Sequence, residues 1–340
     1  MINNKISSNQ LAILSFLLFM APLAFIRSND LNNNIADSVF SFITAAFITF
    51  LLSVPAITGN VRFTENRFIK VLYSLYFVFV VVTDITAVTK MLVNTVIPEG
   101  NSIFIAFSTM IIAIYGALKG VEAVGRGAEI VFFFFISGAL FIILSAIWNV
   151  RPEEYLIPFE NGFDDYVDNT ILIFSAVSFI PMIAVLKEDT EGKFTFKYFT
   201  YMAVALVIGA AFLLEVQFCL GYYALTQEYP IYTLSAVTKA EPLKRLDLVF
   251  AVIFIMASVI RASVSFLCIF KLSYKSSKKY GSFIKIIYLT ATGVLCIIFL
   301  NFEKIISFQL TVYLRALLLI LFSLPVPILL KLSKKRSAYK

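Results

Sequence analysis

The chain has 340 residues, of which 60% are hydrophobic and 14% are charged, and it carries a formal net charge of +7 with no histidine. A water-soluble domain cannot hide so much apolar surface, whereas a lipid bilayer accepts it on the faces of spanning helices. Without histidine, the commonest general base and the commonest metal ligand are missing. The composition therefore argues against a soluble enzyme, and we expect no catalytic residue, no metal ion and no other cofactor.

Ten apolar segments predict an all-α membrane protein, because a bilayer-spanning helix needs about 20 mostly apolar residues. These segments, numbered here as spans 1 to 10, cover residues 10–26, 35–57, 69–95, 102–118, 128–147, 169–186, 198–225, 247–270, 283–300 and 309–330.

The loops between the spans are short, and the longest polar stretch, residues 148–169, is too small for a domain with its own core. We therefore expect a single transmembrane domain over residues 1–340. Its first five-helix half lies at about 8–150, its second half at about 165–332, and a basic cytoplasmic tail follows at 333–340.

Lysine and arginine gather in alternate loops of the predicted bundle. They are numerous before span 1 and after spans 2, 4, 6, 8 and 10, whereas the other loops hold few of them: Arg27, Arg151, Lys239, Lys244, Arg245 and Lys304. Basic residues near span ends stay in the cytoplasm, so we expect both termini there and the acidic loop 151–168 outside. The charge thus predicts a multi-pass cell-membrane protein that contacts the lipid bilayer and binds no nucleic acid.

Two prolines interrupt spans 1 and 6 at matching positions. Pro22 and Pro181 each lie about twelve residues into their span, and a proline within a helix releases the carbonyl four residues before it. We therefore expect the carbonyls of Leu18 and Val177 to be free. Free backbone groups at this depth are tolerated only where protein or a wet cavity satisfies them.

Spans 1 and 6 open the two halves of the chain and cross the bilayer in opposite directions. Matching interruptions in opposed halves are typical of inverted-repeat transporters, whose substrate sites lie at the breaks. Two ordinary proline kinks would give the same pattern, and the spacing alone does not separate the two interpretations.

Five charged residues within or at the edge of spans require an explanation: Asp84, Glu215, Arg261, Arg315 and Lys90. We expect Glu215 to cap a polar pocket with Gln217, and a proton-sensitive carboxylate is the alternative. Asp84 and Arg261 lie near the middles of spans 3 and 8, where a lone charge costs roughly 3 kcal/mol or more. We expect the two to pair across the core, either as a purely structural ion pair or with a role in coupling or gating; separate solvation is the alternative. Lys90 and Arg315 are expected to reach the outer surface with their long side chains.

Three stretches carry a resemblance to a known family. They are residues 5–11 (KISSNQL), residues 115–129 with GVEAVGRG at their centre, and residues 229–234 (YPIYTL) followed by 243–247 (LKRLD). In order and spacing they resemble the spore-germination permease-like B subunits of the GerAB type, which belong to the amino acid–polyamine–organocation superfamily. The resemblance covers essentially the whole chain.

The resemblance implies a LeuT-like inverted repeat with broken helices 1 and 6 and a small nutrient bound near the breaks. It also implies assembly with an A subunit and a C lipoprotein in the inner membrane of a dormant spore. The chain departs from the wider superfamily at the first break, where transporter relatives often carry glycines and this sequence has Ala21-Pro22-Leu23. This departure casts doubt on the usual contacts to an amino acid.

For a ligand near the breaks, released carbonyls attract cations and half-helix N-termini attract anions. The residues expected to contact it come from the two breaks and from spans 3 and 8: Ala21, Pro22, Val177, Ser178, Phe179, Tyr76, Val80 and Ser258. Ordinary packing is the alternative role for each of them.

Three functions remain open on the sequence. The leading hypothesis is the B subunit of a nutrient germinant receptor, which binds a small, amino acid-like germinant at mid-membrane and triggers germination with the A and C subunits. The first alternative is a secondary transporter of amino acids, coupled to protons or sodium. The second is a structural or channel-forming membrane subunit that binds no ligand.

Overall fold

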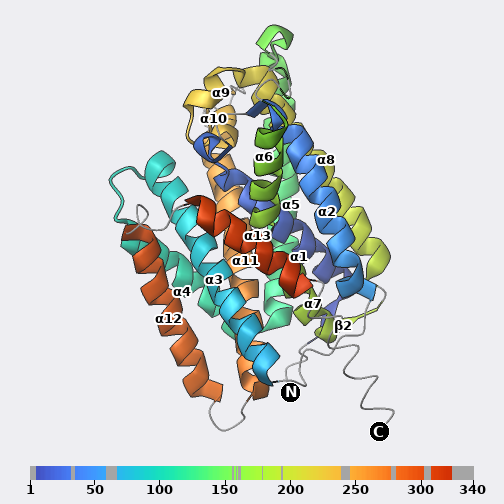
Figure 1. The fold of residues 1–340 in the computed structure, drawn as a ribbon, viewed down its shortest axis with the longest axis vertical. Helices are drawn as coiled ribbons and strands as arrows, with labels where there is room; N and C mark the ends of the chain where they lie inside the picture. The colour runs from blue at the N-terminus through green and yellow to red at the C-terminus, as the bar shows by residue number, and fades with distance from the viewer. Residues whose placement is uncertain are drawn as a thin grey trace.

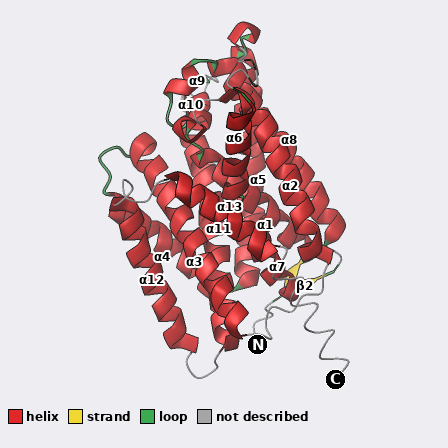
Figure 2. Ribbon diagram, in the orientation of Figure 1, coloured by secondary structure: helices red, strands yellow, loops and turns green. Residues whose placement is uncertain are grey.

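The computed structural model describes residues 5–31, 35–58, 67–154, 157, 159, 162–177, 179–192, 194–238, 246–276, 281–301 and 308–323. These residues are almost entirely helical (Figures 1 and 2). The α-helices are α1 (Ser8–Met20), α2 (Ser38–Thr58), α3 (Arg67–Met91), α4 (Ser102–Lys119), α5 (Val121–Ala146), α6 (Phe163–Ala176), α7 (Ile180–Leu186), α8 (Thr195–Leu220), α9 (Tyr223–Thr226), α10 (Pro230–Val237), α11 (Leu246–Ser276), α12 (Gly281–Asn301) and α13 (Phe308–Ser323).

Shorter elements join these helices. They are the 3₁₀ turns η1 (Ala21–Phe25), η2 (Ser28–Leu31), η3 (Ile35–Asp37), η5 (Ile147–Asn149), η6 (Pro152–Glu154) and η7 (Lys187–Asp189), the π-helical turn η4 (Leu92–Val96), and the two-residue strands β1 (Ile6–Ser7) and β2 (Thr190–Glu191).

Among the described residues, nine helical segments are long and apolar enough to cross a bilayer, and a shorter apolar helix, Thr311–Ser323, follows them. Together they match the ten predicted spans in order, which confirms an all-α, multi-pass membrane protein. Two span ends differ from the prediction because glycines with positive φ set them. Gly120 (φ 94°) lets α5 begin at Val121, and Gly221 (φ 49°) ends α8 at Leu220.

The start of span 1 is tied to the end of span 6. Ser7 and Gln10 form a capping box that begins α1, with both side-chain-to-backbone hydrogen bonds at 3.1 Å. β1 pairs in parallel with β2, and Lys5 Nζ lies 2.9 Å from Glu191 Oε1. These two segments therefore lie at the same end of the bundle, as the predicted topology requires.

A second set of contacts ties segments that the topology places at the opposite end. Ser28 N donates to the Glu228 carbonyl at 3.2 Å, Asn94 Nδ2 donates to Glu228 Oε1 at 2.9 Å, and Arg27 Nη1 lies 3.8 Å from Glu228 Oε1. The segments after spans 1, 3 and 7 thus meet around one glutamate.

The helices pack in two groups, and each group takes matching helices from both halves of the chain (Figure 1). α1 and α2 pack with α6, α7 and α8, whereas α3 and α4 pack with α11 and α12. α11 also contacts α1, α5 and η1, so it lies where the two groups meet. This is the arrangement expected of a LeuT-like inverted repeat.

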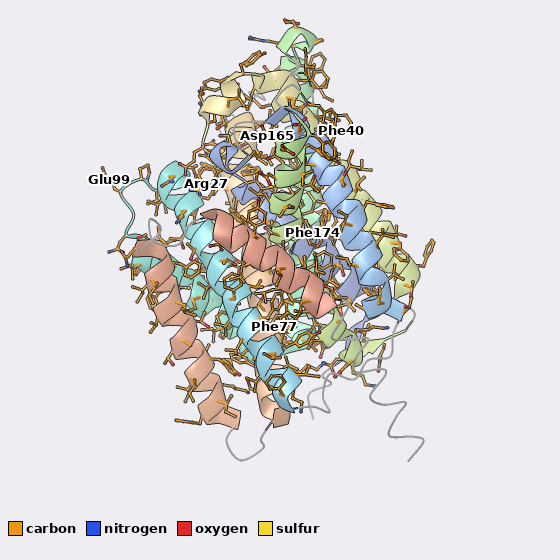
Figure 3. The ribbon with its side chains drawn as sticks, in the orientation of Figure 1. Arg27, Phe40, Phe77, Glu99, Asp165 and Phe174 are labelled. Carbon is orange, nitrogen blue, oxygen red and sulfur yellow. The ribbon has the colours of Figure 1, made fainter. Side chains whose placement is uncertain are left out.

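Apolar side chains fill the body of the bundle, and charged ones gather toward its ends. In Figure 3, Arg27, Glu99 and Asp165 lie in the upper part of the molecule, whereas Phe77 and Phe174 lie among the helices. Phe77 and Phe174 are buried, and Glu99 is exposed. A charged side chain inside the bundle is therefore surrounded by apolar groups and needs a partner nearby.

One close helix contact predicts a stability effect. A Cβ atom at Gly209 of α8 would overlap Phe42 Cζ of α2, whereas one at Gly127 of α5 would lie 3.5 Å from Ile260 Cδ1. We expect Gly209→Ala to lower the free energy of unfolding by about 1–3 kcal/mol through overpacking. Gly127→Ala is the matched control and should leave it unchanged or slightly raised. Thermal unfolding in detergent measures both, and equal melting temperatures for the two variants would contradict this account of the contact.

Candidate functional site

Both predicted helix interruptions are present, and they differ in form. At span 1 the α-helix ends at Met20 and tightens into the 3₁₀ turn η1, with Pro22 at its start. At span 6, α6 ends at Ala176, Val177 departs from helical geometry (φ −82°, ψ 44°), and α7 begins at Ile180. Span 1 is therefore overwound at its break, whereas span 6 is opened.

The backbone groups released at these breaks are held by one side chain. Arg261 of α11 donates from Nη1 to the Leu18 carbonyl and from Nη2 to the Ala176 carbonyl, the latter at 2.8 Å. The prediction that the Val177 carbonyl is free was wrong by one residue, because Arg261 binds the carbonyl of Ala176 instead. The chain bends at Val177, whose own carbonyl accepts a hydrogen bond from Phe179 N at 2.8 Å.

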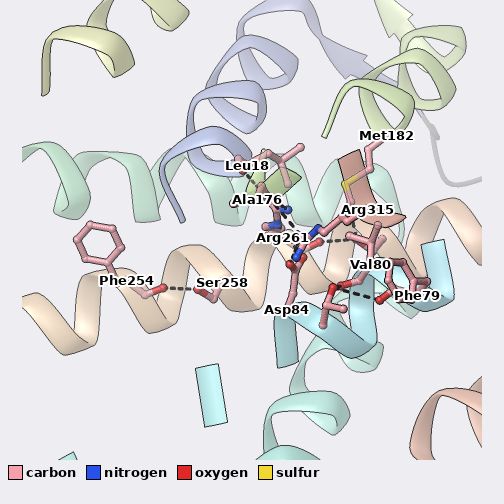
Figure 4. A network of polar contacts seen from close by, with 12 residues as sticks. Leu18, Phe79, Val80, Asp84, Ala176, Met182, Phe254, Ser258, Arg261 and Arg315 are labelled. Carbon is pink, nitrogen blue, oxygen red and sulfur yellow. Dashed lines mark hydrogen bonds and ion pairs between the residues drawn. The ribbon is translucent and has the colours of Figure 1, made fainter. Parts of the chain in front are cut away.

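The guanidinium of Arg261 belongs to a buried charged cluster with Asp84 and Arg315, which we call the Arg–Asp–Arg cluster. Arg261 Nε lies 2.7 Å from Asp84 Oδ2, and Arg315 Nη2 lies 2.7 Å from Asp84 Oδ1. Figure 4 shows Asp84 between the two arginines. The side chains are 2%, 10% and 11% exposed for Arg261, Asp84 and Arg315. The structure therefore brings Asp84 and Arg261 together, and it adds a second cation.

Arg315 was expected at the outer surface, and this expectation was wrong. The Arg315 side chain, in α13, is only 11% exposed and lies against Asp84. α13 also lies obliquely across the bundle against α6 and α3 (Figure 1), which directs Arg315 inward. One feature of the sequence is compatible with this contact. Asp84 in span 3 has two carboxylate oxygens, so it can accept hydrogen bonds from two arginines.

The Arg–Asp–Arg cluster carries a net charge of +1, because arginine stays protonated in proteins and the aspartate offsets only one of the two. Each Asp84 oxygen accepts from a different arginine, and Arg315 Nη2 also lies 3.4 Å from the Ala176 carbonyl. The cluster thus links α3, α11 and α13 to the broken ends of α1 and α6.

A cavity of about 160 Å³ lies against this cluster. Its lining comes from the first break, α3, α6, α12, α13 and the segment before α10: Pro22, Phe25, Ile26, Arg27, Thr83, Asp84, Thr86, Ala87, Lys90, Leu172, Ser175, Ala176, Tyr229, Phe299, Thr311, Val312 and Arg315. Asp84 and Arg315 form its charged wall, and the contacts of Arg27 place the cavity toward the end of the bundle that holds Glu228.

Most of the predicted ligand contacts lie behind the cavity rather than in its wall. Pro22 lines it, and Asp84 does so as a member of the charge pair. The other described positions are buried in the packing: Ala21, Tyr76, Val80, Val177, Phe179 and Ser258. Ser178 lies outside the described residues.

Specific contacts explain why those positions are filled. The Tyr76 ring packs on Phe322 with centroids 5.0 Å apart, the Phe179 ring meets Phe19 edge-on at 6.2 Å, and Ser258 Oγ donates to the Phe254 carbonyl at 2.7 Å. The cavity therefore begins at Thr83 and Asp84, one turn further along α3 than the predicted contacts Tyr76 and Val80.

In the described residues, no group of three or more Asp, Glu, Cys or His side chains comes together that could hold a metal ion. What the site can do is bind a small polar molecule. Its volume is close to that of an engineered cavity of about 150 Å³ that holds benzene. The charged wall on one side and apolar residues on the other favour an amphiphilic ligand.

Matching helix breaks in two opposed halves, with a cavity beside them, are features of a LeuT-like transporter fold. The chain superposes on a Na⁺-coupled sialic acid symporter, solved in a substrate-bound outward-open state, with a TM-score of 0.63 and 14% sequence identity. The match covers 94% of this chain and 78% of the symporter chain, and at this identity it shows the fold alone.

The family model described as "Spore germination protein" (Spore_permease) matches residues 66–301. The chain therefore belongs to the spore germination permease family, which confirms the resemblance drawn from the sequence. A search of curated protein sequences finds no match.

Proposed function

We propose that the chain is the B subunit of a spore nutrient germinant receptor, a permease-like sensor rather than an enzyme. It binds a small germinant in the cavity beside the Arg–Asp–Arg cluster and triggers germination together with an A subunit and a C lipoprotein. It lies in the inner membrane of the spore with both termini in the cytoplasm, as the distribution of basic residues predicts. The observation that carries the proposal is a cavity of about 160 Å³ that lies against the Arg–Asp–Arg cluster, whose Arg261 holds both helix breaks.

The geometry supports a direct route from ligand to signal. Asp84 and Arg315 line the cavity, and Arg261 lies behind them against Leu18 and Ala176. A ligand that shifts Asp84 or Arg315 changes the partners available to Arg261, and so changes how firmly α11 holds the two broken helices. The resulting movement of one helix group against the other is the signal passed to the partner subunits.

Filling the cavity tests this proposal. Ala87 of α3 lines the cavity, whereas Leu75 of the same helix is 53% exposed on the outside of the bundle. We expect Ala87→Trp to raise the half-maximal nutrient concentration for germination at least about tenfold, the effect of losing roughly 1.4 kcal/mol of ligand binding. Germination of spores that carry the variant with its A and C subunits measures this, with protein level checked by immunoblot.

Leu75→Trp is the control and should leave the dose response unchanged, because it places the same indole against lipid. A normal dose response in Ala87→Trp spores with normal protein levels would rule out this cavity as the germinant site.

The likeness to a sodium-coupled symporter favours one alternative, a secondary transporter of amino acids. In such folds, carbonyls of unwound helices coordinate the coupling ion, and here the guanidinium of Arg261 takes the carbonyls of Leu18 and Ala176. We therefore expect binding of the nutrient to the purified chain to be unchanged when choline replaces sodium. Calorimetry measures this, and a loss of affinity beyond about tenfold without sodium would favour the transporter.

Uptake of a labelled nutrient into proteoliposomes of the chain alone separates the transporter from the sensor. The remaining alternative, a structural or channel-forming subunit without a ligand, requires that the same calorimetric titration shows no binding of any nutrient that germinates the spores.

A further inference from the structure

The wall of the cavity has an excess of positive charge. Among its lining residues are three basic side chains, Arg27, Lys90 and Arg315, and one acidic side chain, Asp84. Both oxygens of that carboxylate already accept from arginines, because Arg261 takes Oδ2 and Arg315 takes Oδ1. The single negative charge of Asp84 is therefore shared between two arginines, which disfavours a further positively charged group beside it.

Such an excess is costly inside a membrane protein, because charge in apolar surroundings loses its hydration. Glu228 lies 3.8 Å from Arg27 and offsets charge at that edge of the cavity. The charge of the Arg–Asp–Arg cluster, at the inner wall, is not cancelled by its own members. An anion placed in the cavity would offset it, and a carboxylate matches the planar fork of an arginine especially well.

A buried hydroxyl group gives a second, independent indication of a ligand. Thr86 of α3 lines the cavity and is 6% exposed, and its Oγ1 has no hydrogen-bond partner among the described residues. Its neighbour in the lining, Thr83, is satisfied instead, because its Oγ1 donates to the Phe79 carbonyl at 3.1 Å and to the Val80 carbonyl at 2.9 Å. A buried hydroxyl without a partner destabilises the protein, and a hydrogen bond to a ligand oxygen would offset this loss.

The rest of the lining is apolar and limits the other end of the ligand. Aliphatic and aromatic side chains from the first break, α6, α12 and α13 surround the space: Phe25, Ile26, Leu172, Phe299 and Val312. A compact apolar group fits there, and a second charged group would lose its hydration without a partner.

We infer that the cavity recognises a small carboxylate with a compact apolar group, and that the carboxylate is held by Arg315 and the Thr86 hydroxyl while an ammonium group is not required. This inference rests on the proposed function and narrows the ligand within it. If the ligand is an amino acid, its carboxylate is bound by Arg315 and Thr86, and no residue of the cavity binds its amino group.

Four probes of nearly equal size test the charge requirement: propionate, propionamide, L-alanine and L-alaninamide. Titration calorimetry on the full chain in nanodiscs measures their affinities. We expect propionate to bind at least about tenfold more tightly than propionamide, which corresponds to roughly 1.4 kcal/mol. L-alanine should bind no more tightly than propionate, and the cationic L-alaninamide should bind most weakly.

Two isosteric variants test the hydroxyl. Thr86→Val removes the unpartnered hydroxyl and should weaken propionate binding by about tenfold to a hundredfold, the scale of one hydrogen bond to a charged group. Thr49→Val is the control: Thr49 of α2 is buried outside the cavity lining and its Oγ1 donates to the Ala45 carbonyl of its own helix at 2.8 Å, so its loss should leave the affinity for propionate unchanged. Equal effects of the two variants would show that the Thr86 hydroxyl does not contact the ligand.

The outcomes separate this inference from the proposed function. If propionamide or L-alaninamide binds as tightly as propionate, the preference for an anion is wrong and the germinant cavity stands. If L-alanine binds far more tightly than propionate, the amino group is recognised after all and the inference is overturned. If no probe binds and Ala87→Trp leaves germination normal, both the inference and the proposed site are overturned.

Discussion

Replacing Arg261 by alanine is expected to lower the free energy of unfolding by about 3–5 kcal/mol, the usual cost of removing one partner from a buried ion pair. The loss is large because one guanidinium holds three groups. Asp84 loses an ion-pair partner at 2.7 Å, and the carbonyls of Leu18 and Ala176 lose their charged donor. We expect the variant to melt well below the wild type and its spores to give no nutrient response.

The matched control for this prediction is another arginine in an ion pair. Arg126 pairs with Glu122 on the surface, with its side chain 70% exposed, and such pairs contribute about 0–1 kcal/mol. Arg126→Ala should therefore leave the melting temperature almost unchanged. Arg261→Lys keeps the charge but has a single ammonium in place of a planar fork, so it should recover only part of the stability. Thermal unfolding in nanodiscs measures all three variants, and an Arg261→Ala chain as stable as Arg126→Ala would contradict the assignment.

Replacing Asp84 by asparagine is expected to have an effect of similar size, because it leaves two buried arginines facing each other without a counter-charge. We expect a loss of about 3–5 kcal/mol in the free energy of unfolding. Asp168→Asn is the control, because Asp168 accepts an exposed hydrogen bond from Tyr313 Oη at 2.8 Å and its loss should cost little.

A second substitution shows whether charge is the reason. Removing one arginine as well, in Asp84→Asn/Arg315→Gln, relieves the repulsion. The double variant should therefore be more stable than the sum of the two single losses predicts, by about 1–3 kcal/mol. Strict additivity of the two substitutions would mean that Asp84 and Arg315 do not interact in the folded protein.

The features that depend on local sequence could be predicted. Hydropathy and alternating basic loops indicate the spans, and Pro22 and Pro181 mark the two breaks, because a missing backbone N–H acts within one turn of its position. The contact between Asp84 and Arg261 also follows from a local argument. An unpaired charge at mid-bilayer is costly, so two opposite charges on helices that pack together are expected to form an ion pair.

The position of the cavity could not be predicted, because it depends on how helices cross. The angle of α13 brings Arg315 to Asp84, and the aromatic contacts of Tyr76 and Phe179 fill the space that the breaks alone suggested. Neither is encoded in spacing along one helix. The Thr86 hydroxyl, which has no partner among the described residues, could not be predicted either, since threonines in helices usually bond to the preceding turn.

The two hydrogen bonds from Arg261 to the carbonyls of Leu18 and Ala176 set an energetic threshold for any signal that separates α11 from α1 and α6. Charge-assisted hydrogen bonds contribute about 1.5–3 kcal/mol each, so breaking both costs about 3–6 kcal/mol. A ligand can supply this only by binding the rearranged receptor about 10²–10⁴-fold more tightly than the resting one. Under the proposed function, molecules that only fit the resting cavity would occupy it without triggering germination.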